Sequence, residues 1–133
     1  MPKQTDEPTL YFDVPPVKVE VYCSAGFREG TKKLYHELGP QQSCHFSTIN
    51  ELIVRFARGD RLSTTAFRQE AIGYAFRSGR VRFYGVYSRE RKGSFVLSHA
   101  IAKAKDKLDQ SDIDAMSSCL KTFDSWAKTR RTS

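Results

Sequence analysis

The chain has 133 residues, which is enough for one compact domain and too few for two ordinary ones. Hydrophobic residues make up 39% and aromatic residues 12%, which excludes wholesale disorder, and no apolar run approaches the roughly 18 residues of a membrane-spanning helix. The formal net charge of +7 favours an anionic partner.

The N-terminal half predicts a strand followed by a helical hairpin. Residues 1–16 include Pro8, Pro15 and Pro16 and are expected to form a flexible extension. After them, VKVEVYC (17–23) alternates like a half-buried strand. Ser24 can cap a helix over 25–38 that stops at Gly39-Pro40. A second helix is expected to start near Thr48, with Glu51 completing a capping box, and to end at Gly59.

The C-terminal half predicts three strands and a last helix. Residues 61–73 read as an irregular connection. Close spacing then makes Tyr74–Arg77, Val81–Tyr87 and Ser94–Ala100 an antiparallel meander. A basic loop leads to a helix that begins at Ser111, and residues 128–133 are expected to form a frayed basic tail.

This order of elements predicts the α+β class, with an antiparallel sheet against which the helices pack. We expect one domain over 17–127, with one sheet face packed on helices and the other open. The start of the chain lacks the basic head and apolar centre of a signal peptide. Three widely spaced cysteines (Cys23, Cys44 and Cys119) match no zinc-binding pattern. We therefore expect a cytoplasmic protein with free thiols, no metal, no cofactor and no membrane contact.

The positive charge is confined to one quarter of the chain. Residues 74–107 hold nine basic and two acidic residues, and the remaining 99 residues are balanced. A confined patch of this kind is typical of a nucleic-acid surface. Besides the residues considered for catalysis below, the expected RNA-binding residues are Arg80, Tyr84, Arg89, Arg91, Lys92 and Lys107.

The residues near this patch suit one reaction. We find no metal motif, no phosphate-binding glycine loop and no carboxylate pair near the patch, so any chemistry must use Lys, Arg, His and Tyr. His99 ends the third strand of the meander, and Lys103 and Lys105 follow it. Repulsion among lysines is expected to lower the pKa of one of them, which would suit a base. Metal-independent RNA cleavage needs only such a base, a cation at the phosphate and an acid, because the substrate supplies its own 2′-hydroxyl nucleophile.

The stretch YAFRSGRVRFYGVYSRERKGSFVLSHAIAKAKDKLDQSDIDAM resembles the C-terminal half of RelE/ParE-superfamily toxins, especially the HigB and phage-derived branch. The resemblance covers about residues 17–125 and implies a RelE-like fold. It implies catalytic roles for Arg77, Arg82, His99, Lys103 and Lys105. The catalytic tyrosine that many members carry near the C-terminus is replaced by Phe123 and Trp126, which leaves Tyr84 or His99 as the general acid.

The resemblance implies the toxin of a type II toxin–antitoxin system, an endoribonuclease that cleaves mRNA on the ribosome and is silenced by a cognate antitoxin protein. An acidic antitoxin segment could mask the basic patch. Two alternatives stay open. One is a ParE-like toxin that poisons a protein target such as gyrase, which would not need the His and Lys cluster. The other is a non-catalytic RNA-binding domain, which needs only the positive patch.

Overall fold

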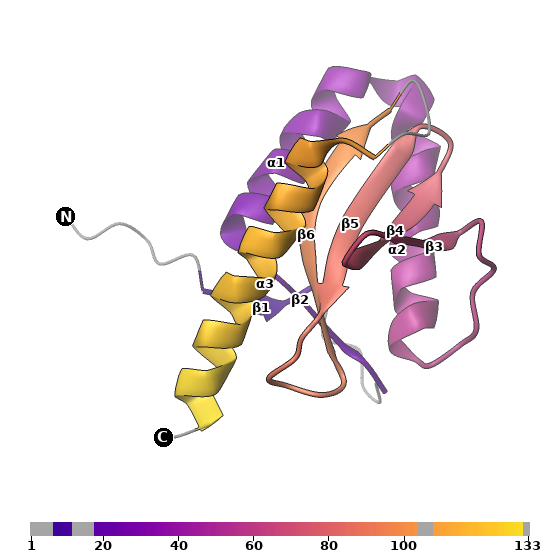
Figure 1. Ribbon diagram of the computed structural model, residues 1–133. Helices are drawn as coiled ribbons and strands as arrows, with labels where there is room; N and C mark the ends of the chain where they lie inside the picture. Colours follow the sequence, from indigo (N-terminus) through magenta and orange to yellow (C-terminus); the bar gives the residue numbers. More distant parts are fainter. Residues whose placement is uncertain (1–6, 12–17, 104–107, 132–133) are drawn as a thin grey trace.

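The computed structural model describes residues 7–11, 18–103 and 108–131, and its centre is a six-stranded sheet with the strand order β1-β2-β6-β5-β4-β3 (Figure 1). The elements are β1 Thr9–Leu10, β2 Glu20–Cys23, α1 Ala25–Leu38, the 3-10 turn η1 Pro40–Gln42, α2 Ser43–Ala57, β3 Phe67–Glu70, β4 Gly73–Ser78, β5 Val81–Tyr87, β6 Ser94–Ala102 and α3 Gln110–Arg131. Strands β3 to β6 are antiparallel neighbours, whereas β2 runs parallel to β6, with Glu20 opposite Ser94 and Tyr22 opposite Val96. The predicted α+β class is therefore confirmed.

Helices lie on both faces of the sheet (Figure 1). On one face, the α1–α2 hairpin buries a cluster that includes Phe27, Ile49 and Phe83. On the other face, α3 buries a second cluster that includes Met116 and Tyr84. The expectation that one face would stay open was wrong for the part that α3 covers. The reason is visible in β5, where every residue from Val81 to Val86 is buried, as in strands enclosed by two helical layers.

The first predicted helix is confirmed at both ends. The Ser24 side chain accepts a hydrogen bond from the backbone N–H of Phe27 at 3.1 Å, and Gly39 ends the helix at a φ of +80°. The second helix begins at Ser43 rather than near Thr48, because η1 leads into it directly. The proposed capping box of Thr48 and Glu51 was therefore wrong, since both residues lie inside α2.

Three further segments differ from their predictions. Thr9–Leu10 pairs with β2, although the segment 1–16 was expected to lack regular structure. Phe67–Glu70 forms β3 within the stretch expected to be irregular, because Phe67 can pack on Phe76 and its ring stacks on Tyr74 at 4.7 Å. Residues 128–131, expected to be a frayed tail, complete the last turn of α3.

Two glycines, Gly85 in the sheet and Gly30 in a helix, provide a stability test. A Cβ at Gly85 would lie 2.3 Å from the Phe95 ring and 2.8 Å from the carbonyl oxygen of Val96, whereas a Cβ at Gly30 in α1 would meet nothing within 4 Å. We expect Gly85→Ala to lower the free energy of unfolding by about 2 kcal/mol through overpacking. Gly30→Ala should raise it by about 0.5–1 kcal/mol through helix propensity. Urea unfolding of both variants measures the difference. Equal effects of the two substitutions would contradict the close packing at Gly85.

Candidate active site

A compact group of polar side chains lies where β5, β6 and the first turn of α3 meet. Asp112 stands at its centre, with its Oδ1 2.9 Å from His99 Nε2 and its Oδ2 2.8 Å from Lys103 Nζ. Lys103 Nζ also lies 3.6 Å from Asp109 Oδ2. Tyr84 completes the group, since its ring stacks on that of His99 at 4.9 Å. We call these five residues, Tyr84, His99, Lys103, Asp109 and Asp112, the Asp112 cluster.

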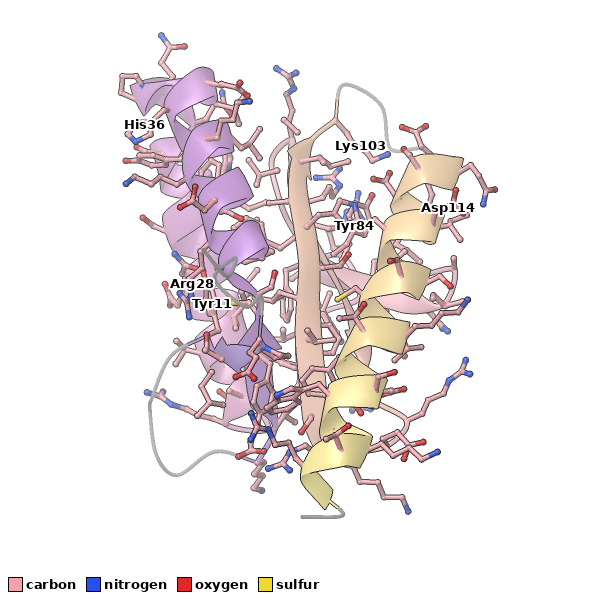
Figure 2. The ribbon with its side chains drawn as sticks, turned by 90° about the vertical axis from the view of Figure 1, so that its left-hand side faces the viewer. Tyr11, Arg28, His36, Tyr84, Lys103 and Asp114 are labelled. Atoms are coloured by element: carbon pink, nitrogen blue, oxygen red, sulfur yellow. The ribbon has the colours of Figure 1, made fainter. Side chains whose placement is uncertain are left out.

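Sheet geometry explains why the cluster forms. Register places Tyr84 of β5 opposite His99 of β6, so their rings share the face that α3 covers. Asp112 is in the first turn of α3, where its Oδ2 also accepts the backbone N–H of Asp109 at 3.3 Å. In Figure 2 the labelled Lys103 and Tyr84 lie beside the upper end of α3.

The charges of the cluster stabilise one another. Burial alone would raise the pKa of Asp112, but hydrogen bonds from Lys103 and His99 more than offset this and hold the pKa below its usual value. Burial alone would lower the pKa of Lys103, but its bond to Asp112 and the nearby Tyr84 and Asp109 raise the pKa instead. The expectation of a lysine with a lowered pKa is therefore wrong for Lys103, because the carboxylates of Asp109 and Asp112 contact its ammonium group.

The tautomer of His99 follows from its partners. A carboxylate can only accept, so Nε2 carries the hydrogen that it donates to Asp112. In the neutral ring Nδ1 is then the basic nitrogen, and it lies 2.8 Å from the hydroxyl oxygen of Ser98. The His99 side chain keeps 22% of its surface exposed, whereas those of Lys103 and Asp112 keep 6% each. His99 is thus more accessible than the Lys103 and Asp112 side chains with which it forms the ion-pair network.

Tyr84 is not available to RNA. Its side chain is fully buried, and burial raises the pKa of its phenol to about 12. The hydroxyl has no hydrogen-bond partner among the described residues. The expected roles of Tyr84 in base stacking and as general acid are both wrong in this structure, because α3 and the His99 ring cover it.

The two strand arginines lie close to the cluster. Arg77 of β4 faces Arg82 of β5 in the register, on the same face as Tyr84. Arg77 is half-buried, whereas Arg82 is 6% exposed and donates from Nη1 to the carbonyl oxygens of Gly79 at 2.7 Å and Val81 at 3.1 Å. Arg82 can therefore contribute a positive field, but its burial contradicts the expected direct contact with phosphate. Arg80 is exposed and contacts the Lys103 carbonyl oxygen through Nε at 3.4 Å.

The basic residues do not form one continuous patch. Arg89, Arg91 and Lys92 lie in the loop between β5 and β6, at the opposite end of β5 from Arg80 and Arg82, roughly 20 Å away along a seven-residue strand. Arg91 there contacts Glu20 at 3.3 Å and lies over the Tyr22 ring. Lys105 and Lys107 lie outside the described residues. The single surface expected from the sequence is therefore at least two separate basic regions.

Sequence reasoning missed the two carboxylates of the cluster. In the sequence, Asp112 follows the expected helix start at Ser111 and indicates only a favourable charge in a first helical turn, so no carboxylate was expected near His99. The available signal was the pair Asp109 and Asp112 shortly after Lys103, but it becomes meaningful only once α3 packs against β6. Cys23, Cys44 and Cys119 are free thiols. Within the described ranges, no group of three or more His, Cys, Asp or Glu side chains could hold a metal ion.

Alkaline pH gives a test of the burial of Tyr84. A group whose pKa is higher in the folded than in the unfolded state stabilises the fold fully below the unfolded-state pKa. That stabilisation is lost as the pH rises through the folded-state pKa. Burial raises the pKa of Tyr84 from 10.0 to about 12, so the free energy of unfolding should fall by up to about 3 kcal/mol between about pH 10 and pH 12. The raised pKa of Lys103 also makes the fold less stable as the pH rises. Urea unfolding at about pH 9 and about pH 11.5 should therefore show a smaller loss of stability for Tyr84→Phe than for the unsubstituted protein. An equal loss in the two proteins would place Tyr84 in contact with solvent.

Comparison with known proteins yields no relative: no family model, no curated protein and no solved structure matches this chain. Within the described part of the chain, no helix combines the length and the apolar character needed to cross a membrane.

Proposed function

We propose that this protein is a metal-independent endoribonuclease, the toxin of a type II toxin–antitoxin system, which cleaves mRNA on the ribosome. The observation that carries the proposal is a partly exposed histidine, His99, which the buried Asp112 orients. The same end of the sheet also holds the cations Arg77, Arg80 and Lys103. The resemblance to RelE/ParE-superfamily toxins supports the ribosome and the cognate antitoxin as partners.

The chemistry assigns a role to each accessible group. His99 Nδ1 takes the proton of the ribose 2′-hydroxyl, either directly or through the Ser98 hydroxyl that it contacts at 2.8 Å. The 2′-oxygen then attacks the adjacent phosphorus, and the P–O5′ bond breaks. The resulting imidazolium is stabilised by Asp112, as expected for a carboxylate on the far side of the ring. The 5′-oxygen takes a proton as it leaves, and His99 in its protonated form is the donor that this site offers.

The cations neutralise the charge that builds up at phosphorus. Arg77 and Arg80 are the more accessible guanidinium groups at this end of the sheet, and guanidinium matches phosphate oxygens through paired N–H donors. Arg82 and Lys103 are buried and add a positive electrostatic potential without contacting the phosphate. Lys103 acts on this view through charge and by holding Asp112, and not as a base.

A second candidate is a non-catalytic RNA-binding domain. One observation favours it: both ring nitrogens of His99 and the ammonium of Lys103 already have partners within the protein. A cluster so completely paired can serve as a structural support under a basic surface. This reading requires binding of RNA but no cleavage.

Primer extension on a defined mRNA in a translating extract tests both candidates. We expect the purified protein to produce discrete new 5′ ends that depend on ribosomes. His99→Ala should abolish them, and Lys128→Ala, on an exposed position at the far end of α3, should not. Intact message with the protein bound to ribosomes would support the binding domain instead. Intact message without any binding would overturn both and favour a protein target.

A further inference from the structure

A bulge in β6 brings two neighbouring side chains together. In β6, Leu97 and His99 pair with consecutive residues of β5, so Ser98 between them is the extra residue. Successive residues of a regular strand point to opposite faces of the sheet, and a bulge interrupts this alternation and redirects a side chain. The hydroxyl oxygen of Ser98 can therefore lie 2.8 Å from His99 Nδ1, although the two residues are adjacent in the chain.

The direction of each hydrogen bond follows from the tautomer of His99. Nε2 carries the hydrogen that it donates to Asp112, so Nδ1 of the neutral ring has a lone pair and accepts. The hydroxyl of Ser98 is then the donor in its contact with Nδ1. A hydroxyl that donates to an imidazole, which in turn donates to a buried carboxylate, is the arrangement that activates a serine nucleophile. The two ring nitrogens have exchanged roles relative to the serine-protease triad, but the order of donors and acceptors is the same.

A cavity of about 230 Å³ lies between β6 and α3, and Ser98 lines it. Contacts along α3 show how the helix follows the strand. Asp112 contacts His99 at the start of α3, and Cys119, two turns further on, contacts the carbonyl oxygen of the residue before Ser98 at 3.9 Å. Ala115 also lines the cavity and lies between these two contacts. Its small side chain leaves space beside Ser98, which a longer side chain at this position would fill.

The walls of the cavity combine apolar side chains with the positive end of a helix. The apolar side chains belong to Pro8, Val96, Leu97 and Phe123. Ser24 lines the same cavity and caps the N-terminus of α1, where the helix dipole favours negative charge. In Figure 2, α1 and α3 lie on either side of β6. The cavity therefore suits a short apolar group, with a helix N-terminus at its wall to stabilise an oxyanion.

We propose that Ser98, His99 and Asp112 form a catalytic triad that hydrolyses esters of short apolar carboxylic acids. Ser98 Oγ attacks the carbonyl carbon of the ester, His99 Nδ1 takes the hydroxyl proton, and the carbonyl oxygen becomes an oxyanion. The C–O bond to the alcohol then breaks, and the alcohol leaves with the proton from His99. Water attacks the acyl group on Ser98 and gives a proton to His99 Nδ1. The carboxylic acid is released as Ser98 Oγ takes this proton back.

The chain contains a second serine–histidine contact, which serves as an internal control. His45 Nδ1 lies 2.9 Å from Ser78 Oγ, and both residues are half-buried, as Ser98 and His99 are. Among the described residues, no carboxylate contacts His45. The Ser78–His45 pair thus matches the proposed pair in distance and exposure, but it lacks the group that orients the imidazole.

Labelling of the full chain with an alkyl fluorophosphonate tests the proposal. The reagent forms an Oγ–P bond with an activated serine and releases fluoride. We expect mass spectrometry to find the label on Ser98 and not on Ser78. His99→Gln should slow the labelling of Ser98 by about 10²-fold or more, because the glutamine amide cannot accept the proton. No label on Ser98, or equal labelling rates at Ser98 and Ser78, would overturn the proposal.

Hydrolysis of p-nitrophenyl butyrate measures turnover. Ser98→Ala should lower the rate by about 10²-fold or more, whereas Ser78→Ala should leave it unchanged, with urea unfolding to show that both variants are folded. An unchanged rate in Ser98→Ala would assign the hydrolysis to other side chains and overturn the proposal. The proposal does not rest on RNA cleavage, in which Ser98 forms no covalent bond. Cleavage of mRNA without ester hydrolysis would overturn the triad alone, and ester hydrolysis without cleavage of mRNA would overturn the endoribonuclease alone.

Discussion

Asp112→Ala is expected to lower the free energy of unfolding by about 3 kcal/mol or more, as measured by urea unfolding at neutral pH. The carboxylate is buried and holds both Lys103 and His99. Removing one partner of a buried ion pair leaves the other charge uncompensated, which typically costs about 3–5 kcal/mol. Loss of a negative charge in the first turn of α3 adds to the effect.

The matched control is Asp114→Ala. Asp114 lies two residues further along α3, is exposed, and accepts a hydrogen bond only from Gln110 among the contacts described for it. Its removal should change stability by no more than about 0.5 kcal/mol. The double variant Lys103→Met/Asp112→Leu should recover much of the loss, because no unpaired charge then remains buried. If Asp112→Ala and Asp114→Ala were equally mild, the Asp112 cluster would not exist as an ion-pair network.

His99→Gln is expected to reduce RNA cleavage by about 10²–10⁴-fold while leaving the fold intact. The glutamine amide can still donate to Asp112 from nearly the position of the imidazole Nε2, but it cannot accept and release a proton. A loss of this size is what general acid–base catalysis by one side chain contributes. Single-turnover cleavage of a ribosome-bound message measures it, and urea unfolding shows that the variant is folded.

Binding measured beside cleavage separates catalysis from structural support. If His99 transfers protons, His99→Gln loses cleavage but still binds the ribosome and its message. Lys128→Ala should retain both cleavage and binding. A His99→Gln variant that cleaves at the full rate would show that the paired histidine is structural and that another group transfers the protons.

These two predictions also bear on how the site could be recognised. The sequence indicated His99 and Lys103 because they follow a strand and lie in a basic stretch, and the structure brings them to one carboxylate. It also indicated Tyr84, but alternation alone cannot say which face of a strand a helix will cover. The packing of α3 against β5 and β6 decides that Tyr84 is buried and that Asp112 faces His99.

The sequence by itself determined the elements whose signals are local. The cap at Ser24, the glycine stop at Gly39 and the tight turn at Gly79 each depend on a few neighbouring residues, so α1 and the β4–β5 hairpin could be predicted from local signals. Only the tertiary structure decided the pairing of β1 and β3 at the two edges of the sheet, the separation of the basic residues to both ends of β5, and the burial of Tyr84 beneath α3. These features depend on contacts between residues far apart in the chain, and their free energy comes from burial and ion pairing that no short stretch of sequence contains.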